Sequence, residues 1–302
     1  MGSDPKPRVA ITVGDPAGIG PEIAQKAADD SRVRAACDPV LYGPPGGVQF
    51  QPGVLSADAG RAAYDAICTA VADAQAGTVA AIATAPVNKL AFARAGLRWK
   101  GHTDLLAHLT GVRRAAMMFW SDPLKVVLAT VHVPLAEVPR LLTAELLDDV
   151  IRVTARELPR FGIASPRLAL AGLNPHAGEH GLLGSEDDQV LGPAVEKARG
   201  GGVDIAGPFP GDTVFVRASR GEFDAVIACY HDQGLIPVKL LAFGRAVNVT
   251  LGLPIIRTSV DHGTAFDIAG QGKADPSSLI EATLLAARLA GVRPPSQPDS
   301  RG

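Results

Sequence analysis

The sequence predicts an α/β protein in which parallel strands alternate with helices. Five short apolar runs, rich in Val, Ile, Leu and Ala, have the composition of strands that are covered on both faces. Amphipathic segments lie between them, and this alternation extends over nearly the whole chain. The five runs begin at Arg8, Val79, Lys125, Arg167 and Asp224.

Two of the intervening segments have a clear helical pattern. GRAAYDAICTAVADAQAG begins at Gly60, and TAELLDDVIRVTARELPRFG begins at Thr143. In the second, Thr143 suits an N-cap and Gly162 suits a stop. The first strand is followed by VGDPAGIGPE, from Val13, which has two interpretations. It resembles a phosphate-cradling turn, and it equally suits a tight strand-to-helix turn with Pro21 near the first helical position.

The composition excludes several classes of protein. A chain of 302 residues allows one large domain or two ordinary ones. With 47% apolar residues, 20% charged residues and a net charge of −2, it lacks the basic face of a nucleic-acid-binding protein. Three cysteines without a CxxC pair indicate a reducing compartment, and neither a secretory signal nor a membrane-length apolar run occurs. We therefore expect a cytoplasmic protein without nucleic-acid or membrane partners.

Three histidines each follow an apolar run by a few residues: His132, His176 and His231. The carboxyl ends of parallel strands meet at one edge of a sheet, where α/β proteins bind ligands. Three imidazoles gathered there would make a divalent metal site with positions open to substrate. A single histidine at a strand end is also often a hydrogen-bonded structural residue, and no two of these form a local motif. The pattern alone leaves both interpretations open.

Another polar segment, RTSVDHGTAFDIAGQGKAD, begins at Arg257. Segments so dense in polar groups and glycines usually bind a ligand, although a solvated connection is the alternative.

Taken together, these segments resemble the 4-hydroxythreonine-4-phosphate dehydrogenase (PdxA) family. The motifs that carry the resemblance occur in order from about residue 8 to residue 290: GDPAGIGPE, APVNKLAFARAGLRWKGHTDLLA, HVPL, GLNPHAGEHGLLGSED, GPFPGDTVF, YHDQGLIPVK and VNVTLGLPIIRTSVDHGTAFDIAGQGKAD. The resemblance implies two α/β/α domains with a cleft between them, as in the isocitrate and isopropylmalate dehydrogenases, and a homodimer with the active site at its interface. The implied domains, with approximate boundaries, are a discontinuous cofactor-binding domain, 1–100 plus 256–302, and a metal, substrate and dimerisation domain, 101–255.

The resemblance also implies roles for individual residues. His132, His176 and His231 match the ligands of one divalent ion per subunit (Zn, Mg or Co). The implied substrate contacts are His102, Thr103, Lys239, Asn248 and Arg257. The implied contacts to NAD or NADP are His262, Gly263, Thr264 and Asp267, and no basic cluster beyond Lys273 favours the extra phosphate of NADP. The catalytic base stays open between Asp212, Lys239 and a metal-bound water.

The expected reaction is NAD(P)-linked oxidation of a β-hydroxy acid with a small anionic group, followed by decarboxylation. The expected substrate is 4-phosphooxy-threonine (4-hydroxy-L-threonine phosphate), which would give 3-amino-2-oxopropyl phosphate for pyridoxal phosphate biosynthesis. The alternatives are a sugar-acid phosphate, such as threonate or erythronate 4-phosphate, and the cis-dihydrodiol of terephthalate. Rivals of other kinds are a non-redox ligand-binding protein and a metal-dependent decarboxylase without a nicotinamide. Two features depart from the family pattern: a shorter segment after Tyr42, and Asp104 where Glu is usual.

Overall fold

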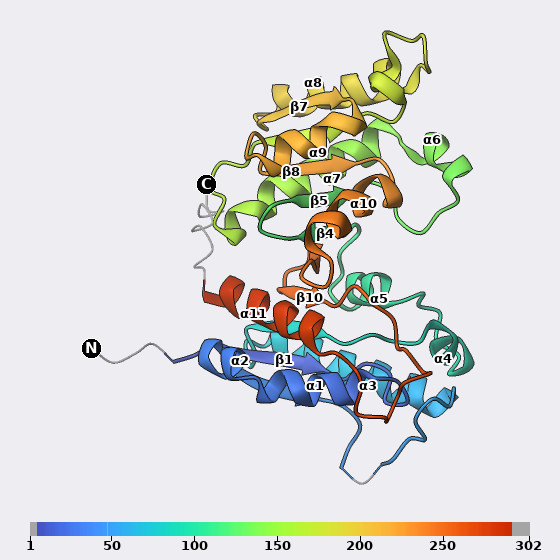
Figure 1. Cartoon of the computed structure of the whole chain (residues 1–302), viewed down its shortest axis with the longest axis vertical. Coiled ribbons are helices and arrows are strands. Elements are labelled where there is room, and N and C mark those ends of the chain that lie inside the picture. The colour runs from blue at the N-terminus through green and yellow to red at the C-terminus, as the bar shows by residue number, and fades with distance from the viewer. Residues whose placement is uncertain (1–4, 47, 292–302) are drawn as a thin grey trace. The chain divides into compact units, whose positions relative to one another are not determined.

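The computed structural model describes residues 5–46 and 48–291, which form two α/β units (Figure 1). The described part of the first unit is 5–46, 48–115 and 247–291, and that of the second is Ala116–Ala246. The end of the expected cofactor domain, 292–302, lies outside the described residues.

The division between the units differs from the expected boundaries at residues 100 and 255. The helix α5 (His102–Leu109) belongs to the first unit because Leu105 and Leu106 are part of its buried core. The strand β9 (Val247–Leu251) also belongs there, because it pairs with β10 (Arg257–Ser259). The side chains of α5 and β9 therefore belong to the first unit, whereas the family resemblance placed residues 101–255 in the second.

The first unit contains a five-stranded sheet in the order β2-β1-β3-β10-β9. The first four strands run parallel and β9 is antiparallel to β10. The strands not yet defined are β1 (Arg8–Thr12), β2 (Asp38–Tyr42) and β3 (Ala81–Thr84).

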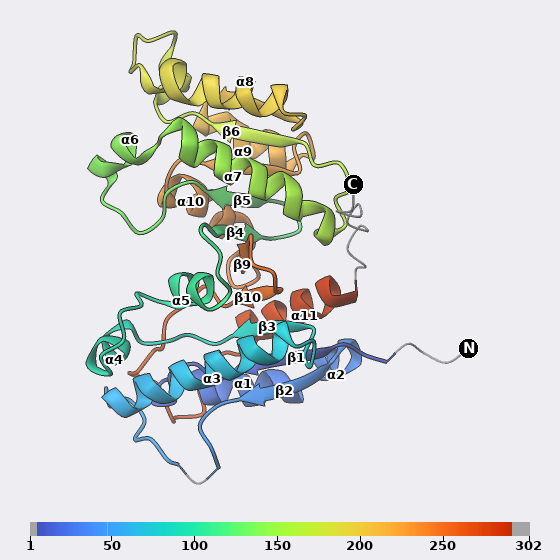
Figure 2. The ribbon, with the colours of Figure 1, turned by 180° about the vertical axis from the view of Figure 1, so that it is seen from behind.

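Helices cover both faces of this sheet. One face is covered by α3, whose Ala63 and Ile67 share a core with Phe92 of α4 and Leu105 of α5 (Figure 2). The helices α1, α2 and α11 cover the other face (Figure 1). Their bounds are α1 (Gly20–Asp29), α2 (Ser31–Ala36), α3 (Ala57–Gln75), α4 (Lys89–Arg94) and α11 (Ser277–Gly291).

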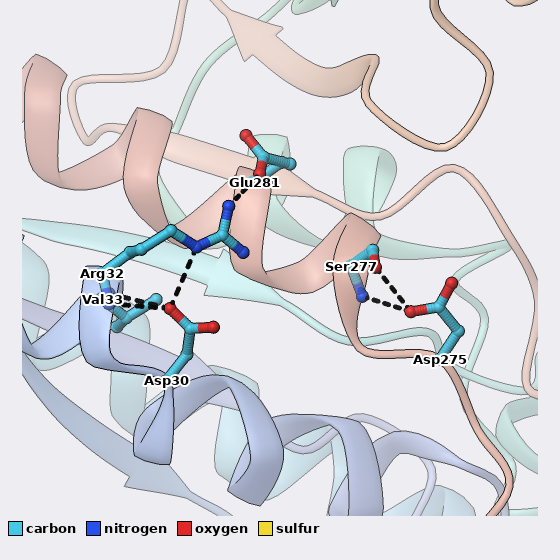
Figure 3. Close-up of polar contacts among 6 residues, drawn as sticks. All are labelled: Asp30, Arg32, Val33, Asp275, Ser277 and Glu281. Carbon is cyan, nitrogen blue, oxygen red and sulfur yellow. Dashed lines mark hydrogen bonds and ion pairs between the residues drawn. The ribbon is translucent and has the colours of Figure 1, made fainter.

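Aspartates define where two of these helices begin (Figure 3). The Asp30 side chain accepts hydrogen bonds from the backbone N–H groups of Arg32 and Val33, which caps α2. Asp275 accepts from the backbone N–H of Ser277 at 2.9 Å and so stands at the start of α11. The Arg32 guanidinium also pairs with Glu281 at 3.1 Å and joins α2 to α11, although so exposed an ion pair contributes little stability.

The second unit contains a five-stranded sheet in the order β4-β5-β8-β6-β7. The strand β4 is antiparallel to β5, and all other pairs are parallel. The strands are β4 (Ala116–Trp120), β5 (Lys125–Leu128), β6 (Leu168–Ala171), β7 (Ile205–Phe209) and β8 (Ala225–Ala228).

Helices again lie on both faces, with α9 and α10 on one side (Figure 1) and α7 and α8 on the other (Figure 2). The Thr143 hydroxyl accepts a hydrogen bond from Leu146 N at 3.2 Å, which confirms the expected N-cap of α7. Gly162, at φ 83°, ends the short 3-10 turn that follows α7. The helices are α6 (Val138–Leu141), α7 (Ala144–Glu157), α8 (Gly192–Gly200), α9 (Gly211–Ser219) and α10 (His231–Ala242).

The α/β fold class is confirmed, and the five apolar runs form β1, β3, β5, β6 and β8. These are interior strands, and helices lie on both faces of each sheet. The remaining five strands had not been identified from the sequence. Within residues 5–46 and 48–291, no helix combines the length and apolar character needed to cross a membrane.

Candidate active site

Polar side chains form a row across the first unit's sheet, near the carboxyl ends of β1, β3 and β10. In register order the row is Thr12, Thr84, Ser259 and Asn248. Because residues in register point to the same face of a sheet, these side chains share one face. The carboxyl ends of parallel strands are where α/β sheets bind ligands, so the row marks a candidate binding surface.

The guanidinium of Arg257 is buried beside this row. The residue is only 3% exposed. Its Nη1 donates to Thr250 Oγ1 at 2.9 Å and its Nη2 donates to Thr84 Oγ1 at 2.7 Å, whereas Nε has no partner. No carboxylate in the described part of the chain forms an ion pair with it, and burial lowers the pKa of Arg257 to about 9. A buried cation held only by neutral hydroxyls is suited to receive an anion.

Two neutral groups near Arg257 also have unused hydrogen-bonding atoms. The Nε2 atom of His102 and the Oδ1 atom of Asn248 are both buried without a partner. Burial, followed by the charge of Arg257, lowers the pKa of His102 well below its usual value. His102 is therefore a neutral imidazole at neutral pH, and its hydrogen-bonding capacity is available to a ligand.

His102 and Thr103 form the first turn of α5, and both side chains are partly exposed. Asp104, where the family usually has Glu, accepts a hydrogen bond from Lys100 N at 2.5 Å. That bond links the backbone just before α5 to a side chain in the first turn of the helix, and so fixes the direction in which the helix begins.

The turn GDPAGIGPE is shaped by contacts within the chain. A Cβ atom on Gly20 would lie 1.8 Å from the carbonyl oxygen of Val13, and one on Gly14, at φ 66°, would lie 2.2 Å from that of Pro86. Ile19 N, at the start of α1, donates to Thr264 O at 3.0 Å. The glycines are needed for this close packing, and Pro21 lies in the first turn of α1. The geometry therefore favours the tight-turn interpretation over a phosphate cradle.

The expected cofactor-binding residues lie on the irregular segment 262–275 between β10 and α11. His262, Gly263 and Asp267 are exposed, and Thr264 is partly buried against the GDPAGIGPE turn. Their role in binding a nicotinamide nucleotide stays a prediction.

In the second unit, the three candidate metal ligands follow three adjacent parallel strands. The strands lie in the order β5-β8-β6, and each histidine lies no more than five residues beyond the end of its strand. His132 follows β5, His231 follows β8 and His176 follows β6. The topology thus brings all three to the same edge of this sheet.

Hydrogen bonds tie these strand ends together. The Thr130 hydroxyl donates to Cys229 O at 2.7 Å and joins the end of β5 to that of β8. The Gln233 amide accepts from Cys229 N at 2.7 Å and donates to Gly172 O at 2.6 Å, which joins β8 to β6. The stretch CYHDQG therefore ends its strand abruptly because Gln233 turns back to hold the neighbouring strand.

Two of the histidines have a geometry that suits a shared metal ion. The ring centroids of His132 and His231 are 5.5 Å apart. Two imidazoles bound to one tetrahedral ion place their centroids about 5 Å apart, given metal–nitrogen distances of about 2.0–2.1 Å. His231 Nδ1 is bonded to Asp232 Oδ1 at 2.7 Å, so in its neutral form the lone pair of Nε2 can face a metal.

The third histidine is not assembled with this pair. Among the described residues, no three His, Cys, Asp or Glu side chains are grouped closely enough to hold a metal ion. The donor type and the shared sheet edge fit a divalent metal, and the complete ligand set stays a prediction.

The segment that carries His176 is strained and firmly anchored. His176, Ala177, Glu179 and His180 all have positive φ, between 45° and 55°, which is unfavourable for residues other than glycine. The carboxylate of Asp187 is fully buried and accepts hydrogen bonds from Leu173 N, Asn174 N and Asn174 Nδ2 at 2.8–3.0 Å. Strained backbone of this kind is often found at functional sites.

The two candidate proton acceptors lie on the surface of the second unit. Asp212 is exposed in the first turn of α9, and Lys239 is exposed on α10, two helical turns beyond His231. Their catalytic role stays a prediction. Thr84, Thr250, Asp187 and Gln233 had not been identified from the sequence, because each acts through a contact with another segment that its own local pattern does not reveal.

Comparison with known proteins places the chain in a family. The family model described as pyridoxal phosphate biosynthetic protein PdxA matches residues 19–286. The chain belongs to this family. A putative D-threonate 4-phosphate dehydrogenase from Bradyrhizobium diazoefficiens is 48% identical, over 93% of this chain and 96% of the relative. A 4-hydroxythreonine-4-phosphate dehydrogenase from Desulforapulum autotrophicum is 44% identical, over 96% of this chain and 97% of the relative.

Solved structures agree with the PdxA assignment. The crystal structure of 4-hydroxythreonine-4-phosphate dehydrogenase from Klebsiella pneumoniae has a TM-score of 0.87 and 41% identity, and covers 95% of this chain and 99% of its own. A terephthalate 1,2-cis-dihydrodiol dehydrogenase from Burkholderia xenovorans has a TM-score of 0.68 and 33% identity, over 93% and 98% of the two chains. Isocitrate dehydrogenase from Methylococcus capsulatus shares the fold, with a TM-score of 0.50 and 18% identity, over 91% and 83%. The chain is thus a dehydrogenase of the PdxA family.

The lowered pKa of Arg257 gives the anion site a predictable pH dependence. Above about pH 9 the guanidinium loses its charge, so affinity for an anion should fall as the pH rises through that value. Sulfate keeps a constant charge over this range, and its affinity should fall by up to about tenfold per pH unit above the pKa of Arg257 in the sulfate-free protein. Calorimetric titration with sulfate measures this, with Arg257→Gln as the control that should bind weakly at every pH. A wild-type affinity that stays constant up to pH 10 would contradict the assignment.

Proposed function

We propose that the protein is a metal-dependent, NAD(P)-linked dehydrogenase that oxidises a phosphorylated β-hydroxy acid, whose keto product then loses carbon dioxide. The proposed substrate is 4-phosphooxy-threonine and the product 3-amino-2-oxopropyl phosphate, in pyridoxal phosphate biosynthesis. The observation that carries this proposal is the buried Arg257 guanidinium, which has no carboxylate partner among the described residues. A phosphate group would supply the missing counter-charge.

The residues around Arg257 support a phosphorylated substrate. The guanidinium offers a charged fork to phosphate oxygens, with its Nη1 and Nη2 held in place by Thr250 and Thr84. The unpartnered atoms of His102 and Asn248 would bind further oxygens or the amino group. Thr103 and Lys239 complete the proposed contacts to substrate.

The chemical step requires a hydride acceptor and a proton acceptor. Hydride passes from the carbinol carbon to NAD or NADP, and the hydroxyl proton passes to a base, for which Asp212 and Lys239 are the proposed residues. A divalent ion (Zn, Mg or Co) held by His132, His176 and His231 would polarise the substrate oxygen. Asp232 keeps the His231 ring oriented, and Gln233 keeps the strand ends that carry His231 and His176 together.

We propose NAD as the preferred cofactor, bound by His262, Gly263, Thr264 and Asp267. The only lysine of this segment, Lys273, donates to Gln271 Oε1 at 3.2 Å. A site for the extra phosphate of NADP often has an arginine nearby, and the segment 262–275 contains none, which supports NAD. The three cysteines are free thiols, which supports a location in the cytoplasm.

A homodimer is proposed because α10 is apolar on two sides. Leu235, Val238 and Ala242 are buried in the core of the second unit. On another side, Ile236 is 58% exposed and Leu240 81% exposed, and Phe243 after the helix is 79% exposed, at the spacing of one helical face. A helix that is apolar on both sides is usually covered on both.

Sedimentation at micromolar concentration tests the dimer, and a monomer would contradict it.

A second candidate substrate is D-threonate 4-phosphate, which the 48% identical Bradyrhizobium relative favours. It carries a hydroxyl in place of the amino group and would use the same anion site. The terephthalate dihydrodiol is the third, because its dehydrogenase shares the fold at 33% identity.

A substrate panel tests the proposed function. We expect reduced nicotinamide to appear, by its near-ultraviolet absorbance, with 4-phosphooxy-threonine, NAD and a divalent metal. The panel also includes threonate and erythronate 4-phosphates, the terephthalate dihydrodiol, and the same acids without phosphate. Higher efficiency with threonate 4-phosphate would identify the second candidate. Turnover of the unphosphorylated acids as efficient as that of the phosphorylated ones would contradict the role of Arg257. If the protein bound neither NAD nor NADP, the remaining interpretations would be a decarboxylase without a nicotinamide and a ligand-binding protein.

The metal site is tested by single substitutions. We expect His132→Ala, His176→Ala or His231→Ala each to weaken zinc affinity by at least about 100-fold, because each removes a ligand and not only an outer contact. His180→Ala is the matched control, because His180 is an exposed histidine with positive φ on the same segment as His176. Calorimetric titration of the metal-free protein measures affinity. A His176→Ala protein that binds zinc like the control would contradict the ligand set.

A further inference from the structure

The turn after β1 and the segment 262–275 are joined at two separate places. The first contact is the hydrogen bond from Ile19 N to Thr264 O at 3.0 Å. A Cβ atom on Gly18 would lie 2.8 Å from the same carbonyl oxygen, so only glycine fits beneath it. The two motifs, which are more than 240 residues apart in the chain, therefore form one packed structure.

The second contact is made by Glu22 and Lys26, one turn apart on α1. Lys26 Nζ donates to the carbonyl oxygens of Gly272 and Ala274, at 3.1 and 2.9 Å. Glu22 Oε1 accepts from Ala274 N at 2.9 Å and also from Lys26 Nζ at 2.7 Å. The pKa of Glu22 is lowered, mainly by the hydrogen bond from Lys26 and also by the bond from Ala274 N, whereas burial acts in the opposite direction. The pair thus binds both the N–H and the C=O of Ala274.

Between these contacts the hydrogen bonds of the segment are local, although its backbone also packs closely on Pro52 and Gly53: a Cβ atom on Gly53 would lie 2.9 Å from Phe266 O, and one on Gly270 would lie 2.7 Å from Pro52 Cγ. Gln271 N donates to Ile268 O and Gln271 Nε2 donates to Asp267 O, at 3.2 and 2.8 Å. Ala265 has a positive φ of 41°, which is costly for a residue with a side chain. Beyond the second contact, Asp275 stands at the start of α11 through its bonds to Ser277 (Figure 3). The hydrogen bonds that join 264–274 to α1 and the turn before it are thus made at its two ends, and its conformation depends in part on where those ends are held.

We infer that Glu22 and Lys26 are positioning residues for the nicotinamide nucleotide. They hold the segment 262–275 in the conformation that binds the cofactor, and they do not touch the cofactor themselves. This inference rests on the proposed function, in which His262, Gly263, Thr264 and Asp267 contact the nucleotide. A segment that is ordered before binding loses less conformational freedom when the ligand arrives, so its affinity is higher.

If Glu22 and Lys26 had a purely structural role, a different result would be expected. In that case, removing the pair would lower stability without changing affinity for any one ligand. A positioning role affects the nucleotide selectively, because substrate and metal are proposed to bind elsewhere. The decisive comparison is between nucleotide affinity and substrate affinity in the same variant.

The test is Lys26→Met in the full-length protein, which removes both bonds to the segment and keeps the length of the side chain. We expect the dissociation constant for NAD, measured by calorimetric titration without substrate, to rise about five- to tenfold. The KM for NAD should rise to the same extent, whereas kcat at saturating NAD and the KM for substrate stay within about twofold. Hydrogen exchange at the amide of Ala274 should also become faster.

Two further variants complete the design. Lys197→Met is the matched control, because it removes a comparable exposed ion pair, with Asp148 at 3.2 Å, in the second unit. Its NAD affinity should equal that of the wild type. Glu22→Gln keeps an acceptor for Ala274 N but removes the charge that holds Lys26, so its effect on NAD affinity should lie between those of wild type and Lys26→Met.

The possible results are distinct. The inference would be overturned if Lys26→Met bound NAD as tightly as the wild type. It would also be overturned if Lys197→Met lost as much NAD affinity as Lys26→Met. If Lys26→Met were too unstable to measure, an unchanged NAD affinity of Glu22→Gln would overturn it. A wild-type protein that binds neither NAD nor NADP would refute the proposed function, and the inference with it.

Discussion

The first unit is organised around a guanidinium that is buried without a carboxylate partner among the described residues. Moving such a charge out of water costs on the order of several kcal/mol, and hydrogen bonds from Arg257 to Thr84 and Thr250 offset only part of this. The strand order of the sheet places those hydroxyls on both sides of β10. The fold thus carries an unfavourable charge at the edge where ligands bind, which is expected of a site selected for anion binding and not for stability.

The second unit shows the same relation between strain and function in its backbone. Four residues with positive φ, His176 among them, follow Leu173 and Asn174, whose backbone N–H groups bind the buried carboxylate of Asp187. The strand ends next to them are tied by Gln233. In both units, polar groups from another segment of the chain hold the unfavourable local feature or the backbone next to it.

The sequence predicted the parts of the fold that depend on local patterns. Five interior strands were identified because both their faces are covered, which leaves continuous apolar runs. The interior strand β10 was missed because it has only three residues, all of them polar. The edge strand β2 was missed because it is only partly buried. The position of Arg257 was predicted from the family motif, whereas its partners Thr84 and Thr250 were not. Nothing in a strand's own sequence indicates which residue lies beside it on the neighbouring strand, and the unit boundaries were displaced for the same reason.

The central claim is that Arg257 is kept for an anion and not for the fold, and the stability of Arg257→Met measures this most directly. At neutral pH the charged guanidinium is disfavoured in the folded state, because its pKa there lies below its usual value. In buffer without phosphate or sulfate, Arg257→Met should therefore be as stable to urea as the wild type, or more stable. Sulfate should stabilise the wild type and leave the variant unchanged. A variant that is strongly destabilised in anion-free buffer, or stabilised by sulfate as much as the wild type, would contradict the claim.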